Sequence, residues 1–252
     1  MRRALVIVQK DLAEVFKSRS TYLYMFVMLF PSASYFFSYF AVADSLTKQH
    51  VSAEVVMAVS RNFMATVAYI VPILYGLFAS QISINLVVLE KTKRNLESLM
   101  AAPFTVREIW LAKSVGVSAS SVVIGWAASV FAYLLIAFGE VAPHVHAFIA
   151  PPPLAIVSGL VVVPLLVLAV ISLVTYMQLV ISNPRVSNFV FVAVFLVVLG
   201  VLLFSLYGLP GRALDQRYYL PLFAGVAAVV GLVSLGFSRR LPKEKIITSN
   251  KQ

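Results

Sequence analysis

The sequence predicts an all-α integral membrane protein with six transmembrane helices, and three observations carry that prediction. The chain has 252 residues, of which 61% are apolar and only 12% are charged, and its mean hydropathy is +0.93. Such a composition cannot cover a surface that faces water. Six uncharged segments are long enough to cross a hydrocarbon core of about 30 Å, and the basic residues gather on one side of them.

The first 21 residues predict an amphipathic helix in the membrane interface, forming an elbow before the first span. An apolar face recurs at three- and four-residue steps: Leu5, Val8, Leu12 and Phe16. Another face carries charges that can pair over a short range: Lys10, Glu14 and Lys17. The alternative is a basic flank that only fixes the topology.

The six spans together form the predicted transmembrane domain, residues 22–238, and a basic cytoplasmic tail follows at 239–252. The spans are expected at 22–43, 63–89, 115–138, 154–181, 189–207 and 220–237. Three prolines fall inside them, which helices in lipid tolerate when neighbouring groups satisfy the freed carbonyl.

The distribution of Lys and Arg predicts the orientation of these spans. Sixteen basic residues lie in the N-terminal segment, the second and fourth loops and the tail, against four in the first, third and fifth loops. Because basic loops stay on the cytoplasmic side, both termini are expected there, and the protein is expected to be a multi-pass protein of the cell membrane. The net charge of +10 therefore indicates membrane topology rather than a nucleic-acid partner.

The sequence contains no recognisable catalytic centre, so we expect that the chain is not an enzyme and binds no cofactor itself. It has no cysteine, no glycine followed by lysine as a P-loop requires, and no charged residue in a span. Glu140, His144 and His146 share the third loop. A solvated loop explains that group better than a metal site, and no metal is expected.

Three amides in the spans are candidates for lining a transport path: Gln81, Asn85 and Gln178. In lipid such groups face protein or a water-filled path, so hydrogen bonding between helices is an equally good interpretation. The last span carries small residues at four-residue spacing, which suits close helix packing: Ala224, Ala227, Ala228 and Gly231.

The stretch 90–113 stands out because it holds eight charged residues in an apolar chain, and Pro103 divides it. Before the proline, Leu96, Leu99 and Met100 form one apolar face of a short helix at about 92–102, with Asn95 as a plausible N-cap. Such a helix can lie on lipid or dock into a groove of a soluble partner, and its narrow face favours docking.

After the proline, Thr105 and Glu108 match a capping box that opens the helix of the third span. Trp110 and Lys113 follow at positions typical of anchors in the membrane interface.

This segment resembles the signature that follows the second span in membrane subunits of the ABC type 2 exporter family. The matching positions are Glu90, Lys91, Lys93, Leu96, Glu97, Leu99, Met100, Pro103 and Lys113. The sequence departs from the signature at Thr92, at Asn95 and at Arg94, where the family has glycine. The stretch KDLAEVFKSRSTYL also resembles the family's elbow helix, whereas the fifth loop is shorter than in many members.

The resemblance implies the membrane-spanning permease of an ATP-driven exporter. In the family this segment is the coupling helix, which docks on a separate cytosolic ATPase, and two permeases and two ATPases form the transporter, with the substrate path between the permeases. ATP and Mg²⁺ would then bind the partner. The implied coupling residues are Glu90, Lys93, Arg94, Leu96, Glu97, Leu99, Met100 and Pro103. The alternatives are a secondary transporter or channel without an ATPase, and a non-transporting membrane scaffold or assembly protein.

Overall fold

The computed structural model describes residues 2–17, 52–92, 105–180 and 219–238, together with single positions between these ranges, and over these residues it is helical without strands. The helices are α1 (Arg2–Lys17), α4 (Ala53–Thr92), α6 (Val106–Ile136), α7 (Ala142–Val145), α8 (Pro153–Val157), α9 (Val163–Val180) and α11 (Tyr219–Ser238). Two π-helical turns, η1 (Ala137–Val141) and η2 (Ser158–Val162), join α6 to α7 and α8 to α9.

Four helical segments among the described residues are long and apolar enough to cross a membrane: Ala53–Leu77, Val106–Gly139, Pro153–Val180 and Leu220–Phe237. They correspond to the second, third, fourth and sixth predicted spans. The first and fifth predicted spans, 22–43 and 189–207, lie outside the described residues except for single positions. One of these is Tyr39, which is buried and hydrogen-bonds Ser60 at 2.7 Å on α4.

α4 is longer at both ends than the predicted second span. It begins at Ala53, ten residues before 63, and continues to Thr92. The extra first turns contain Glu54, Arg61 and Asn62, so hydropathy alone did not include them. The last turn includes Glu90, so the beginning of the charged stretch 90–113 continues the helix of a span.

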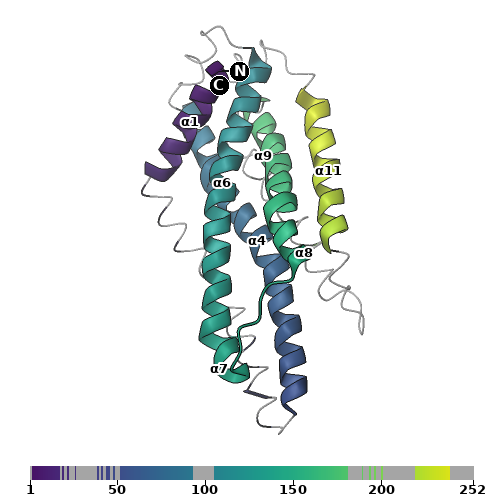
Figure 1. Ribbon diagram of the computed structural model, residues 1–252. Helices are drawn as coiled ribbons and strands as arrows, with labels where there is room; N and C mark the ends of the chain where they lie inside the picture. Colours follow the sequence, from purple (N-terminus) through teal and green to yellow (C-terminus); the bar gives the residue numbers. More distant parts are fainter. Residues whose placement is uncertain are drawn as a thin grey trace.

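The long helices form a bundle that places α1 at one end (Figure 1). α4, α6 and α9 pack on one another, α11 packs along α9, and α1 packs on α6. The start of α6 and the ends of α9 and α11 lie at the end where α1 is found, whereas α7 lies at the opposite end (Figure 1). We call these the proximal and distal ends.

α4 and α6 cross where two glycines meet. A Cβ atom placed on Gly125 would lie 2.9 Å from both the Cα and the N of Gly76. On its other side, Gly76 faces α9, where a Cβ would lie 3.0 Å from Val167. The three central helices therefore approach closely because neither glycine carries a side chain.

η2 ends two residues before Pro164. Pro164 has no N–H to bond the carbonyl of Leu160, and the backbone N–H of Val163 instead reaches back to the carbonyl of Ser158. A π-turn of this kind adjusts the helix where the regular ladder is broken.

Candidate functional site

The start of α6 follows the charged stretch directly, and its geometry is a capping box, as the sequence predicts. The Thr105 hydroxyl accepts a hydrogen bond from the backbone N–H of Glu108 at 3.2 Å. The Glu108 carboxylate accepts one from the backbone N–H of Thr105 at 2.8 Å. Two N–H groups that α6 cannot satisfy itself are thus paired, and the acidic side chain lies at the positive end of the helix dipole.

Trp110 fixes the first turns of α6 to α9. Its side chain is only 1% exposed, and its indole N–H donates to the backbone carbonyl of Ser172 at 2.9 Å. Val106, one turn earlier, packs with Trp110 against Leu179 of α9. The capped end of α6 is therefore held against the last turns of α9.

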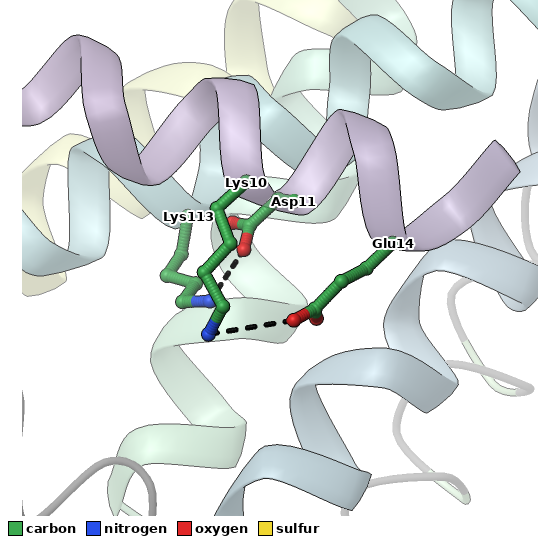
Figure 2. A network of polar contacts seen from close by, with 4 residues as sticks. All are labelled: Lys10, Asp11, Glu14 and Lys113. Atoms are coloured by element: carbon green, nitrogen blue, oxygen red, sulfur yellow. Dashed lines mark hydrogen bonds and ion pairs between the residues drawn. The ribbon is translucent and has the colours of Figure 1, made fainter. Parts of the chain in front are cut away.

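A buried ion pair links the same part of α6 to α1. The Lys113 ammonium lies 2.7 Å from the Asp11 carboxylate, and the two side chains are only 2% and 7% exposed. Figure 2 shows Asp11 pointing from α1 toward Lys113, beside the more exposed pair Lys10–Glu14, whose charged atoms are 3.5 Å apart. The Lys10–Glu14 contact confirms the predicted short-range pairing on α1.

α1 can approach α6 closely because α6 has a glycine at the contact. A Cβ on Gly116 would lie 3.2 Å from the Cβ of Asp11 and 3.3 Å from the Cα of Val8. Val8, Asp11 and Val15 recur at three- and four-residue steps and therefore share one face of α1. That face lies on α6, while Phe16 remains 40% exposed.

The prediction that Trp110 and Lys113 are anchors in the membrane interface is wrong, because both are buried inside the protein. Sequence reasoning also missed Asp11, which was not among the candidate residues of the N-terminal segment. Its position on one helical stripe with Val8 and Val15 was the available signal. No local pattern identifies its partner, because Lys113 lies 102 residues away.

α9 and α11 meet along the small residues of the last span. Ala227 is buried, and a Cβ on Gly231 would lie 3.8 Å from the Cβ of Ala169. Ser234 donates to Ser172 at 2.9 Å, across the same interface. A cavity of about 330 Å³ lies beside these contacts, with Trp110 in its lining.

The structure describes only some of the other predicted site residues. Gln178 is buried, with 3% of its surface exposed, in the proximal part of α9. The side chains of Gln81, Asn85 and Glu90 on α4 lie outside the described residues. The remaining predicted coupling residues also lie outside them: Lys93, Arg94, Leu96, Glu97, Leu99, Met100 and Pro103.

Metal binding has no support in the described part of the chain, where no group of three or more His, Cys, Asp or Glu side chains is arranged to hold an ion. The described geometry is one of close packing between helices. Its distinctive feature is the proximal junction, which we define as Asp11 of α1, Thr105, Trp110 and Lys113 of α6 and its capping turn, and Ser172 of α9.

Comparison with known families gives one finding. The model of the ABC-2 family transporter proteins matches residues 5–219, which is most of the chain. No curated protein and no solved structure matches the chain. The match includes most of α1, the charged stretch and the whole of α6 and α9.

Proposed function

Because the chain belongs to the ABC-2 family of transporter proteins, we propose that it is the permease of an ATP-driven exporter. The family makes it a membrane subunit of a transporter, a multi-pass protein that works in association with ABC ATPases. The proposal adds the outward direction of transport, a path between two permeases, and two cytosolic ATPase subunits that bind the ATP and Mg²⁺.

The observation that carries the proposal is the family match, because it covers the charged stretch together with the helices on both sides. Thirteen residues, 93–105, separate the last residue of α4 from the first of α6. A partner that moved this connection would act on the ends of two long, closely packed helices. Binding of ATP can shift the transporter only if the partner contacts the connection differently in its two states.

The proposed coupling residues divide by chemistry. Leu96, Leu99 and Met100 supply an apolar face for a groove on the ATPase, and Pro103 turns the chain toward α6. Glu90, Lys93, Arg94 and Glu97 supply charge pairs around that face. Gln81, Asn85 and Gln178 are proposed to face the path, which would make them sensitive to substitution by apolar residues.

The test places a charge on the apolar face of the proposed coupling helix. Leu99→Asp should abolish substrate-stimulated ATP hydrolysis by the purified complex, because it buries a carboxylate in an apolar groove. Glu97→Arg should do the same by reversing a charge contact. ATPase activity and transport into vesicles are measured together with the amount of chain inserted in the membrane.

Leu99→Met is the matched control, since it keeps an apolar side chain of similar size, and it should leave coupling unchanged. Normal stimulation in both Leu99→Asp and Glu97→Arg would remove the coupling role from this segment. Transport by the purified chain without any ATPase would instead support a secondary transporter or channel.

A further inference from the structure

A second cavity lies toward the distal end of the bundle, away from the proximal junction. It has a volume of about 520 Å³ and lies between α4, α6, α8 and η2. Ala68 and Pro72 of α4, Trp126 and Tyr133 of α6, and Ala155 and Leu160 of the α8–η2 segment are among its lining residues. We call it the distal cavity.

The polar side chains of the distal cavity are engaged by backbone carbonyls. The Trp126 indole N–H donates to the carbonyl of Gly159 in η2 at 2.9 Å, and the Tyr133 hydroxyl donates to that of Ile149 at 2.7 Å. Ser129 likewise donates to the carbonyl of Gly125. These pairings leave a predominantly apolar wall, which offers water few hydrogen-bond partners.

The distal cavity is open at one side through apolar side chains. Val130, Leu134, Ile156 and Leu160 line it, and between 42% and 59% of each residue's surface is exposed. All four lie within segments able to cross a membrane, so in a single subunit we expect this opening to face the hydrocarbon of the bilayer. What surrounds the opening there is acyl chain rather than water.

The length of the distal cavity is close to the thickness of the hydrocarbon layer of one leaflet. Its lining on α6 extends from Trp126 to Leu134, which at 1.5 Å per residue is about 12 Å along the helix. One leaflet contributes about 15 Å to the hydrocarbon core. If α1 is cytoplasmic, as the basic residues predict, the cavity lies in the outer leaflet.

Arg61 lies on the same face of α4 as the distal cavity, farther toward the distal end of the bundle. Arg61 precedes Ala68 by seven residues and Pro72 by eleven, so the three share one stripe of the helix. The rise from Ala68 to Arg61 is about 10 Å toward the distal end. Arg61 is exposed, and it forms no ion pair within the part of the chain that the structure describes.

We propose that the distal cavity binds one acyl chain of an outer-leaflet glycerophospholipid whose phosphate contacts Arg61. The apolar walls accept the chain, and the guanidinium supplies the complementary charge at headgroup level. The residues that line this site all belong to one subunit. The site therefore does not depend on the direction or the cargo of transport.

The chain offers its own probe for this site, because it has only two tryptophans and Trp126 lines the cavity. The full-length Trp110→Phe variant, reconstituted in vesicles, reports Trp126 alone. Phosphatidylglycerol carrying bromine in the middle of its acyl chains should quench that emission saturably. Ala155→Leu fills the cavity and should abolish the saturable part, whereas Ala127→Leu, at an exposed position of α6 outside the lining, should not.

The headgroup contact has a separate test that requires no change in the core. Arg61→Gln should raise the half-saturating amount of phosphatidylglycerol about fivefold, as expected for the loss of one basic contact with an anionic lipid. Arg107→Gln, an exposed position at the proximal end of α6, is the matched control and should not shift it. If Trp110→Phe does not fold, native mass spectrometry can compare the binding of phosphatidylglycerol to the wild-type chain and to Arg61→Gln.

Three results would overturn the proposal. Quenching of Trp126 by iodide in water would show a hydrated cavity, and equal quenching in Ala155→Leu would show ordinary contact with surrounding lipid. Loss of lipid quenching on dimerisation would show that a second subunit covers the opening. None of these results bears on coupling to an ATPase, so they leave the proposed transport function unaffected.

Discussion

At the scale of single residues, the Asp11–Lys113 pair is the most consequential contact at the proximal junction. Two charges have been removed from water there, and their attraction offsets that cost only while both are present. The pair therefore holds α1 on α6 chiefly because separation would leave each charge buried without its partner. Its net contribution to the stability of the fold is the smaller effect. A movement of α6 would accordingly carry α1 with it.

Removing one member of this pair should be strongly destabilising. Lys113→Met leaves the Asp11 carboxylate buried without its cation, and we expect a loss of about 3–5 kcal/mol in the free energy of unfolding. Thermal and denaturant unfolding of the purified protein in detergent measures this change.

Two controls separate the effect of an uncompensated charge from the loss of a contact. The double variant Asp11→Asn with Lys113→Gln keeps similar volumes without a charge and should recover most of the stability. Lys10→Gln removes the exposed partner of Glu14 and should cost no more than about 1 kcal/mol. A double variant as unstable as Lys113→Met would contradict this account.

At the scale of the elements, the crossing of α4 and α6 depends on the absence of two side chains. Gly76 is surrounded on both sides, by α6 at Gly125 and by α9 at Val163 and Val167. The neighbour that a new Cβ at Gly125 would meet is helix backbone, which cannot move aside as a flexible side chain can. The two helices would have to separate.

Substitution at this crossing should therefore destabilise the bundle although alanine favours helices. Gly125→Ala should lower the free energy of unfolding by about 1–3 kcal/mol through overpacking. Gly236→Ala in α11 is the matched control, since a Cβ there meets nothing within 4 Å, and it should be neutral or stabilising. Equal thermal stability of Gly125→Ala and the wild type would rule out the close crossing.

At the scale of the whole molecule, the described helices place the proximal junction at the end where α9 and α11 finish (Figure 1). The connection that carries the proposed coupling residues other than Glu90 leaves α4 and enters α6 beside this junction. If an ATPase acts there, its movement reaches α6 first and then α1 and α9 through Lys113 and Trp110.

This arrangement requires that the N-terminus and the tail face the cytoplasm. A reporter that is active only in the cytoplasm should be active when it is fused after Ser249, and also when it is fused before Met1, because basic flanks are retained on that side. Fusions after His146, in the third loop, should be inactive. A reporter after Ser249 that worked only outside the cell would contradict the six-span topology.

The sequence by itself determined what depends on neighbouring residues along the chain. Composition predicted the membrane class, and apolar runs located the four spans that the structure describes. The spacing of Thr105 and Glu108 predicted the start of α6, since a capping box requires only four consecutive residues. The charged stretch and its resemblance predicted the family that the comparison then identified.

Only the tertiary structure decided which residues meet across helices. The pairing of Asp11 with Lys113, the contact of Gly76 with Gly125 and the burial of Trp110 against Ser172 join positions 49 to 102 residues apart. Periodicity states which face of a helix a residue occupies, but not which helix lies opposite that face or at what depth. For that reason Trp110 and Lys113 matched the pattern of interface anchors, while the packing of α1 and α9 on α6 placed them in the interior.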